Sequence, residues 1–193
     1  MNPDKVALRA AVLGRRAEMS PLALASASAA VGRHIATKVH ASAATRISAY
    51  LPVGAEPGSI PALDELRRSG VEVLLPVLLG DFDLDWAMYD GPDALVGTPR
   101  GLMEPLGTRL GRDAVATAQI VLVPALAVDP AGHRLGRGGG SYDRALARLG
   151  PDASSVALLH DVELIASVPH EEHDRPVTHT ITPGHGCRPL NDG

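Results

Sequence analysis

The chain has 193 residues and a net charge of −4, and its 45% hydrophobic and 21% charged residues are typical of a folded globular protein rather than a disordered one. The length suits one domain, residues 1–193. The negative charge argues against a dedicated nucleic-acid-binding protein, because such proteins gain affinity by displacing counterions from phosphates with basic side chains.

Two helices are predicted at the N-terminal end of the chain. Over residues 3–19 the apolar residues recur at spacings of three and four, which is the pattern of an amphipathic helix: Val6, Ala10, Leu13 and Ala17. Ser20 followed by Pro21 is typical of an N-cap and a first helical position, and predicts a second helix that ends near Val39.

The first helix also carries a basic stripe. Lys5, Arg9 and Arg16 lie within about 40° of each other at roughly 100° per residue. Such a stripe is either a solvated face or a surface that closes over an anionic ligand.

The start of the second helix superficially resembles a signal peptide. The stretch PLALASASAAV at 21–31 follows two arginines, but Glu18 stands where a signal peptide stays basic. No apolar run approaches the roughly 18 residues that cross a bilayer. We therefore expect a cytoplasmic protein that does not enter a membrane.

Beyond residue 45, predicted strands alternate with predicted helices. Strands are expected at 46–51, 71–79, 84–89, 120–128, 155–159 and 177–182, helices at 60–69 and 141–149, and mostly loop at 90–111. Pro76 is expected to end or bend its strand, and residues 84–89 to leave one face exposed. The pattern predicts an α/β fold, with a mostly parallel central sheet flanked by helices and an N-terminal helical pair.

A glycine-rich loop follows the most apolar predicted strand, in DPAGHRLGRGGGSYDRAL at 129–146. Gly136, Gly138, Gly139 and Gly140 lack Cβ atoms, so the backbone can adopt positive φ and turn its N–H groups inward. The helix that begins behind the loop adds partial positive charge, and Arg134 and Arg137 supply forked donors. The loop is a candidate phosphate cradle.

Asp143 lies one turn into that helix, where its carboxylate would repel a bound phosphate. A Mg²⁺ ion between the carboxylate and the phosphate would explain an acidic residue at this position. The loop is neither a Walker A motif nor a dinucleotide fingerprint, because Gly-Lys-Ser/Thr is missing and Ser141 replaces the last glycine. Nucleotide binding, sugar-phosphate binding and a tight structural turn all remain open on these residues alone.

The stretch VPALAVDPAGHRLGRGGGSYDRAL closely resembles the signature of the 5-formyltetrahydrofolate cyclo-ligase family. Weaker motifs of that family follow the same order along the chain: KVALR at 5–9, YLPVGAEP at 50–57, RGLMEP at 100–105 and HEEHDRPVTHTIT at 170–182. The resemblance covers nearly the whole chain. One departure is Ser141, where the family carries an aromatic residue before the Tyr-Asp pair.

The resemblance implies an enzyme that binds MgATP beside a reduced folate. Lys5 and Arg9 match contacts to the ATP phosphates, and the nucleotide loop matches Arg134, Leu135, Gly136, Arg137, Gly138, Gly139, Gly140, Ser141 and Tyr142. Asp143 and Asp174 match the magnesium positions. Leu51 and Glu56 match the folate-contacting segment, and Arg137 to Tyr142 also border the formyl group. The Glu56 carboxylate can accept hydrogen bonds from the amino and ring N–H groups of a pterin.

The implied reaction is ATP-dependent cyclisation of 5-formyltetrahydrofolate, possibly polyglutamylated, to 5,10-methenyltetrahydrofolate. Arg137, Lys5 and Mg²⁺ would stabilise the transferring phosphoryl group. The alternatives are a phosphosugar-handling enzyme on a similar scaffold and a non-catalytic folate- or nucleotide-binding relative. We expect a monomer or a weak homodimer.

The remaining candidate residues are the aromatic side chains, Glu104, a pair of histidines and the single cysteine. Of the few aromatic residues, Trp86 and Tyr142 are the predicted partners of the pterin, while Tyr50 and Phe82 are assigned to the core. Glu104 is assigned to a structural turn. His170 and His173 lack the spacing of a helical zinc pair, and the single cysteine, Cys187, is assigned as an inert thiol.

Overall fold

The structure is a computed structural model that describes residues 3–190. Its helices are α1 (Pro3–Ala17), α2 (Pro21–Ala41), α3 (Ile60–Arg68) and α4 (Ser141–Leu146), with short 3-10 turns η1 (Pro92–Ala94), η2 (Arg112–Thr117) and η3 (Asp161–Glu163). Its strands are β1 (Arg46–Ser48), β2 (Glu72–Leu78), β3 (Leu84–Met88), β4 (Leu95–Gly97), β5 (Met103–Pro105), β6 (Ile120–Pro124), β7 (Ala127–Val128), β8 (Arg134–Leu135), β9 (Ser154–Leu158), β10 (His179–Thr182) and β11 (Gly186–Pro189).

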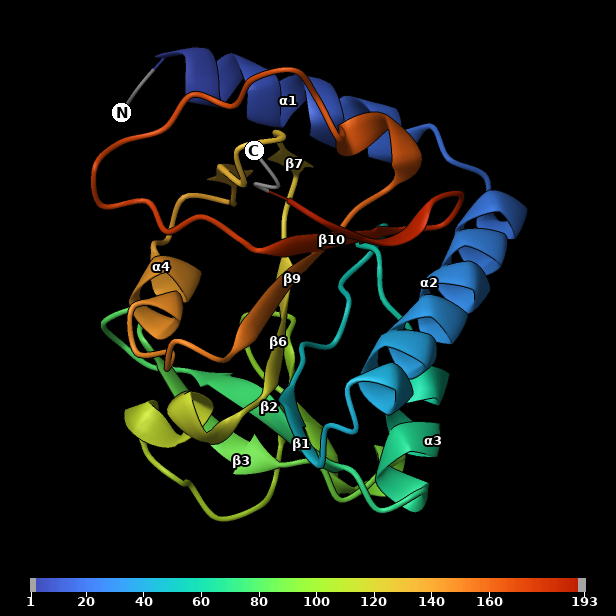
Figure 1. Ribbon diagram of the computed structural model, residues 1–193, viewed down its shortest axis with the longest axis vertical. Coiled ribbons are helices and arrows are strands. Elements are labelled where there is room, and N and C mark those ends of the chain that lie inside the picture. The colour runs from blue at the N-terminus through green and yellow to red at the C-terminus, as the bar shows by residue number, and fades with distance from the viewer. Residues whose placement is uncertain (1–2, 191–193) are drawn as a thin grey trace.

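Within the described residues, a seven-stranded sheet runs in the order β11-β10-β9-β6-β1-β2-β3. The five inner strands are parallel, and the two edge strands pair antiparallel with their neighbours. Helices α2 and α3 lie on one side of the sheet and α4 on the other, while α1 crosses the end near β7 (Figure 1). The predicted fold class is therefore confirmed.

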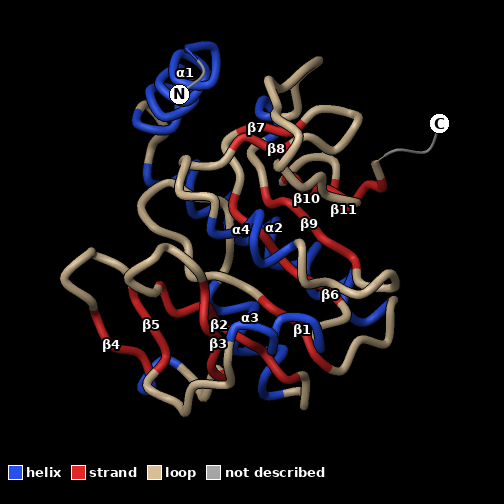
Figure 2. Tube along the Cα trace, turned by 90° about the vertical axis from the view of Figure 1, so that its left-hand side faces the viewer, coloured by secondary structure: helices blue, strands red, loops and turns tan. Residues whose placement is uncertain are grey.

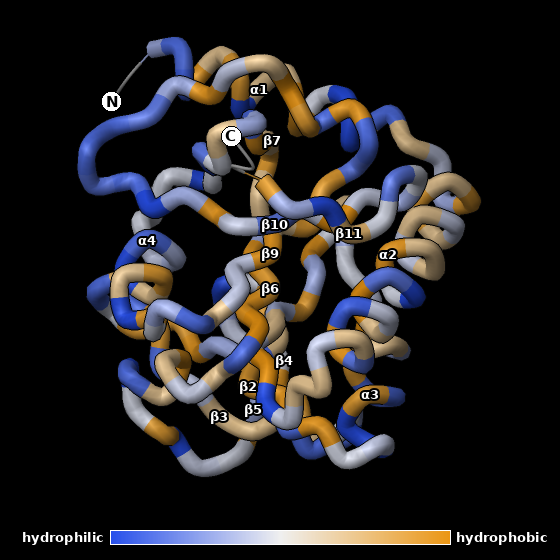
Figure 3. The backbone as a smooth tube through the Cα atoms, viewed as in Figure 1, coloured by the Kyte–Doolittle hydropathy of each residue, from blue (hydrophilic) through white to orange (hydrophobic). Residues whose placement is uncertain are grey.

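The sheet is buried on both faces because its strands carry apolar residues at successive positions. Along β6, Ile120 and Leu122 pack into the cluster beneath α2 and α3, whereas Val121 and Val123 pack into the cluster beneath α4. Side chains alternate between the two faces of a strand, so a continuous apolar run supplies both cores at once. Figure 3 shows the hydrophobic residues gathered along β6 and β9 in the middle of the molecule.

The N-terminal helical pair forms as predicted, but α1 buries a different face from the one its apolar residues suggested. The Ser20 hydroxyl accepts from the backbone N–H of Ala23 and Pro21 opens α2, so this N-cap prediction is confirmed. In α1, however, the four residues of the predicted apolar stripe are exposed. The buried residues are Lys5, Val12 and Arg16, with Val12 packed against the β7–β8 hairpin.

Several predicted element boundaries need correction. Beta-strand β2 continues through Pro76, which lies beyond the residues paired with β1 and needs no donor there. The predicted loop at 90–111 contains the β4–β5 hairpin, and β8 and β11 were not predicted. Beta-strand β3 has no exposed face at its centre, because Trp86 and Ala87 are both fully buried. Its outer edge is covered where the Leu110 N–H donates to the Trp86 carbonyl (2.8 Å).

The order of the strands determines where a ligand site can form. From β1 the chain moves to β2 on one side, and later strands β6, β9 and β10 add on the other side. Beta-strands β1 and β6 are therefore the neighbours at which the winding direction reverses, and the segments leaving their carboxyl ends diverge. These segments are residues 49–59 and 125–140. Figure 2 shows α1 standing over this end of the sheet.

A buried carboxylate ties the β2–β3 turn to the α4 side of the molecule. Asp83 accepts hydrogen bonds from Arg148 (2.6 and 3.0 Å) and from Arg112 (3.0 Å), and is only 2% exposed. The hydrogen bonds from Arg148, followed by the Leu84 N–H and the charge of Arg112, outweigh burial and lower the pKa of Asp83 from 3.8 to about 2.

Asp83→Asn is expected to reduce the free energy of unfolding at neutral pH by about 2 kcal/mol, because it removes the buried countercharge of the partly exposed Arg148 and Arg112. The folded-state pKa of about 2 lies below the unfolded value of 3.8, so the stabilisation is complete above 3.8 and is lost as the pH falls through 2. Urea titrations should therefore show the difference between the two proteins shrinking across this window. A difference that stays constant with pH would contradict this assignment.

Within the described residues, no helix is both long enough and apolar enough to cross a membrane.

Candidate functional site at the switch point of the sheet

A cavity of about 790 Å³ lies where β1 and β6 end, and its size is typical of a site for small molecules. Its walls come from α1, the segment after β1, the β2–β3 turn, the β4–β5 hairpin, the glycine loop and residues 171–174. Every predicted site residue except Trp86 lines it. Residues up to about 170 positions apart in sequence thus share one cavity because the sheet brings their elements together.

The glycine loop lies between β8 and α4, lines the cavity and contains backbone N–H groups without a partner in the described part of the chain. Gly138 and Gly140 adopt positive φ (102° and 67°), as predicted, whereas Gly136 and Gly139 do not. Among residues 3–190, no acceptor is hydrogen-bonded to the backbone N–H groups of residues 138–140. Helix α4 contributes less than expected, because it ends at Leu146 and spans only six residues. The donors of the loop itself are the stronger anion-binding feature.

The basic stripe of α1 faces the cavity. Lys5 Nζ lies 2.6 Å from Asp174 Oδ2 and 3.3 Å from Glu171 Oε1. Arg9 Nε donates to the Gly136 carbonyl (2.8 Å), which places its guanidinium beside the glycine loop. The alternative that the stripe is a solvated face is wrong.

Arg16, one end of the same stripe, anchors α1 to the body of the protein. It makes two hydrogen bonds of 2.7 Å to the carboxylate of Glu163, and it donates to the Ala125 carbonyl at 2.7 Å. Arg16 and Glu163 are both buried, and the Glu163 carboxylate also accepts from the His160 N–H. This bidentate pair fixes the position from which Lys5 and Arg9 reach the cavity.

Two carboxylates stand on the same wall of the cavity. Asp143 Oδ1 accepts from Arg134 Nη2 (2.6 Å) and from the backbone N–H of Arg175 (3.2 Å), which follows Asp174 in the chain. The pKa of Asp174 is lowered, because the hydrogen bonds from Lys5 and the Glu171 N–H outweigh the opposing effect of burial. The pKa of Lys5 is correspondingly raised, since those bonds also outweigh its desolvation.

These carboxylates do not form a complete metal site by themselves. In the described part of the chain, no group of three or more His, Cys, Asp or Glu side chains is arranged to hold a metal ion. Mg²⁺, however, prefers one or two carboxylates together with phosphate oxygens and water. Asp143 and Asp174 fit that donor set, provided that a phosphate-bearing ligand supplies the remaining oxygens.

Glu56, assigned to the folate, and Arg137, assigned both to the nucleotide and to the border of the formyl group, bind each other. Arg137 Nε donates to Glu56 Oε1 (2.9 Å), and the other carboxylate oxygen accepts from the Val53 N–H (3.0 Å). The carboxylate is largely shielded while the guanidinium is more than half exposed. Leu51 lies beside them in the same wall of the cavity.

The aromatic residues require one clear correction. Trp86 is 0% exposed in the core beneath α4 and does not line the cavity, so the prediction that it contacts the substrate is wrong. Phe82, assigned to the core, is 54% exposed and lines the cavity instead. Tyr50 belongs to the core but also touches the cavity, and Tyr142 lines it. Burial, and then the nearby Glu56 carboxylate, raises the pKa of both tyrosine hydroxyls.

Sequence reasoning also missed Arg100 and underestimated Glu104, both of which line the cavity. Glu104 lies in β5 rather than in a turn, and its Oε1 accepts from the Leu78 N–H (3.0 Å), which joins β5 to β2. The only available signal was the RGLMEP motif itself. Its position beside the β2–β3 turn depends on the β4–β5 hairpin, which the glycine- and proline-rich sequence of this segment does not predict.

A mostly parallel sheet with a cation-rich cavity at its switch point is the arrangement with which α/β proteins bind small anionic molecules at the carboxyl ends of their strands. The chain belongs to the 5-formyltetrahydrofolate cyclo-ligase family, whose model matches residues 1–183, and it is therefore an enzyme of the ligase class.

Individual relatives agree with this assignment. The chain is 45% identical over 145 residues to a 5-formyltetrahydrofolate cyclo-ligase of Mycolicibacterium smegmatis, covering 72% of this chain and 74% of the relative. It is 30% identical over 140 residues to the 5-formyltetrahydrofolate cyclo-ligase of Escherichia coli K12, covering 71% and 77%.

Two solved structures share the fold. The NMR structure of 5,10-methenyltetrahydrofolate synthetase from Aquifex aeolicus superposes with a TM-score of 0.82 at 26% identity, over 98% of this chain and 94% of that one. A 5,10-methenyltetrahydrofolate synthetase from Mycoplasma pneumoniae gives a TM-score of 0.77 over 93% and 99% of the chains. At 16% identity, the second likeness concerns the fold alone.

Proposed function

We propose that residues 1–193 form a single domain that cyclises 5-formyltetrahydrofolate to 5,10-methenyltetrahydrofolate, consuming ATP in the presence of Mg²⁺ and releasing ADP and phosphate. One observation carries the proposal beyond family membership. Cations suited to phosphates, a pair of carboxylates and a pterin-type acceptor, Glu56, all face the same cavity. A reaction between two substrates needs both to be held in one enclosed space.

The nucleotide end of the cavity is assigned to α1 and the glycine loop. Lys5 and Arg9 would bind the phosphates from the helix side, and residues Arg134 to Tyr142 from the loop side. The free N–H groups of residues 138–140 support this assignment, because donors that are already oriented stabilise phosphate charge without reorganisation. The Arg134–Asp143 pair holds the start of the loop against α4.

Asp143 and Asp174 would hold Mg²⁺ together with phosphate oxygens. Bound there, the ion would neutralise charge on the phosphates and so favour transfer of the terminal group. Arg134 and Lys5 supply positive charge beside these carboxylates through their ion pairs with Asp143 and Asp174. Binding therefore requires both side chains to share or exchange their partners.

The folate end is assigned to the segment after β1. Glu56 would accept hydrogen bonds from the amino and ring N–H groups of the pterin, and Leu51 would pack against the ring. Tyr142 remains the proposed stacking partner from the loop. Trp86 is buried in the core and takes no part in this contact.

The proposed chemistry needs positioning more than a protein nucleophile. A formyl oxygen is a poor leaving group, so it first takes the terminal phosphoryl group, as the bond from that phosphorus to ADP breaks. The neighbouring folate nitrogen then attacks the formyl carbon with its electron pair. The carbon–oxygen bond breaks with departure of phosphate, and the nitrogen loses its proton. Lys5 and Arg137 would stabilise the charge on the phosphoryl group during transfer.

The test mixes purified protein with 5-formyltetrahydrofolate and MgATP and follows the near-ultraviolet absorbance of the methenyl product. We expect a rise that depends on both ATP and Mg²⁺. Folate and nucleotide binding in a calorimeter without any turnover would instead identify a non-catalytic relative. Turnover that is indifferent to ATP would contradict the phosphorylation step.

A further inference from the structure

The β2–β3 turn holds Phe82 in an unusual backbone conformation. Its φ is 63°, in the left-handed region that bulky side chains rarely adopt, and the residue is 54% exposed and lines the cavity. Such a conformation costs free energy and persists only where the surroundings enforce it. A large apolar side chain kept strained and exposed within a ligand cavity points to a contact with that ligand.

The surroundings of Phe82 do enforce the conformation. The Phe82 N–H donates to the Leu79 carbonyl (3.2 Å), and the Leu79 N–H donates to the Asp83 carbonyl (2.9 Å). The Phe82 carbonyl accepts from Arg144 Nη2 (2.6 Å), which also donates to the Gly139 carbonyl (3.1 Å). Together with the buried ion pairs of Asp83, these bonds tie the turn to the glycine loop.

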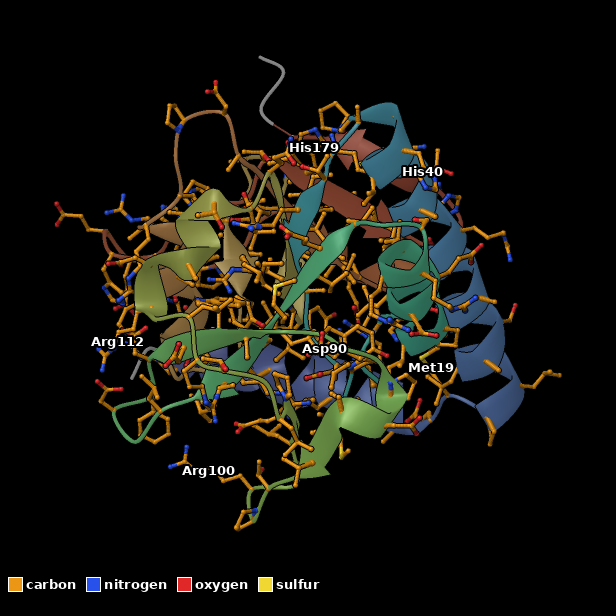
Figure 4. All side chains as sticks on the ribbon, turned by 90° about the horizontal axis from the view of Figure 1, so that it is seen from below. Met19, His40, Asp90, Arg100, Arg112 and His179 are labelled. Carbon is orange, nitrogen blue, oxygen red and sulfur yellow. The ribbon has the colours of Figure 1, made fainter. Side chains whose placement is uncertain are left out.

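Arg100 lies against the same ring. Its guanidinium carbon is 5.5 Å from the centre of the Phe82 ring, a cation–π contact, and its Nη1 is 3.5 Å from the Leu79 carbonyl oxygen. Arg100 reaches the cavity from the loop that joins β4 and β5, at the outer edge of the molecule (Figure 4). It is exposed, so its charged group stands at the mouth of the cavity rather than deep within it.

Arg100 differs from most other cations of the cavity in having no countercharge. Lys5, Arg16, Arg134 and Arg137 are each paired with a carboxylate. Within residues 3–190, no carboxylate lies in ion-pair distance of Arg100 or Arg9. Arg9 stands beside the glycine loop. The cavity therefore offers two unmatched cations, one in each of two different walls.

We propose that Arg100 binds the carboxylates of the glutamate tail of the folate substrate, and that Phe82 supports the aminobenzoyl ring that precedes this tail. The proposal rests on the proposed function and extends it to substrate specificity. A planar guanidinium matches a carboxylate with paired donors, and its position over Phe82 limits its freedom before binding. Because Arg100 stands at the mouth, further γ-linked glutamates would pass into solvent beside it.

The experiment compares three substrates with the wild type and with Arg100→Ala: 5-formyltetrahydropteroate, which has no glutamate, 5-formyltetrahydrofolate, and its triglutamate. Losing one charge-assisted contact corresponds to roughly a tenfold effect. We expect Arg100→Ala to raise KM about tenfold for both glutamate-bearing substrates. The pteroate, the KM for ATP and kcat should be unchanged, and Arg100→Lys should recover part of the loss.

Arg109→Ala is the matched control, because Arg109 is also an exposed arginine, pairs with Glu104 and does not line the cavity. It should leave all three substrates unaffected. Equal losses with the pteroate, or a higher KM for ATP, would overturn the proposal by showing a structural or phosphate-binding role.

Direct calorimetric binding of the three folates separates this proposal from the proposed function. Wild-type protein that fails to turn over any folate would refute the cyclo-ligase reaction. The dependence of folate affinity on glutamate in wild type, and its loss in Arg100→Ala, would still decide the role of Arg100. Affinities that do not depend on glutamate in the wild type would overturn that role.

Discussion

Asp143→Ala and Asp174→Ala should each reduce kcat/KM by at least about 100-fold, which is the scale of losing one oriented group that stabilises charge in a transition state. The two carboxylates stand together, linked through the Arg175 N–H, on the wall that also carries Arg134 and Lys5. Removing either leaves one carboxylate to organise Mg²⁺ and the phosphates. The loss should therefore appear in kcat, in the Mg²⁺ concentration needed for half-maximal rate, and in Mg²⁺-dependent nucleotide affinity.

Both substitutions also remove an ion-pair partner of a buried cation, although Lys5 keeps Glu171 at 3.3 Å, so stability must be measured beside activity. Lys5 is buried and loses its 2.6 Å contact in Asp174→Ala, and the almost fully buried Arg134 loses an equally short contact in Asp143→Ala. Asp143→Asn and Asp174→Asn keep the shape of the side chain and should show the same catalytic loss with less destabilisation.

Asp64→Ala is the control for removing an ion-paired carboxylate outside the cavity. Asp64 is bound by Arg67 and Arg68 on α3, and its loss should leave turnover unchanged. Full activity and unaltered Mg²⁺ dependence in both Asp143→Asn and Asp174→Asn would remove these carboxylates from the proposed metal site.

The presence of a parallel sheet and the position of the cavity could be predicted from local patterns of apolar residues and glycine- or proline-rich loops. Apolar runs such as 120–124, each followed by a loop rich in glycine or proline, predict buried parallel strands whose ends gather functional residues. Those local patterns do not predict the order of the strands in the sheet. It depends on long-range pairing, such as β6 beside β1, which no short window contains.

The errors share a physical cause, which is that ligand sites reverse the usual rules of burial. On α1 the residues of the predicted apolar stripe face outward, because Lys5 and Arg16 are buried by ion pairs with distant carboxylates. In the aromatic set, Trp86 packs in the core while Phe82 is held exposed with positive φ. Amphipathic periodicity and side-chain size favour the opposite assignment in both cases. Only the tertiary partners of these residues decide it.

Arg137→Ala is expected to reduce the rate of turnover, whereas Glu56→Gln is expected to reduce the affinity for folate. Arg137 donates to the Glu56 carboxylate that is proposed to bind the pterin, so each of the two groups is the other's partner. A pterin that takes the place of Arg137 on Glu56 would release the guanidinium toward the phosphoryl group. Folate binding would thereby complete the charge stabilisation needed for transfer.

We expect Arg137→Ala to lower kcat by about 100-fold or more, since the group acts on the transferring phosphoryl group. Its KM for folate should not rise, because the substitution also removes a competitor for Glu56. Glu56→Gln should instead raise the KM for folate about tenfold or more, since a largely shielded carboxylate proposed to accept pterin N–H groups is replaced by an amide. At saturating folate this variant should retain most of its kcat.

The double variant tests whether the exchange of partners takes place. If Glu56 restrains Arg137 until folate arrives, the Glu56→Gln substitution frees the guanidinium in advance, and nucleotide affinity without folate should rise in this variant but not in the double variant. Calorimetric titration of MgATP into the four proteins measures this directly. The exchange is refuted if the nucleotide affinities of wild type and Glu56→Gln are equal, and a high folate KM in Arg137→Ala with normal kcat would assign Arg137 to substrate binding alone.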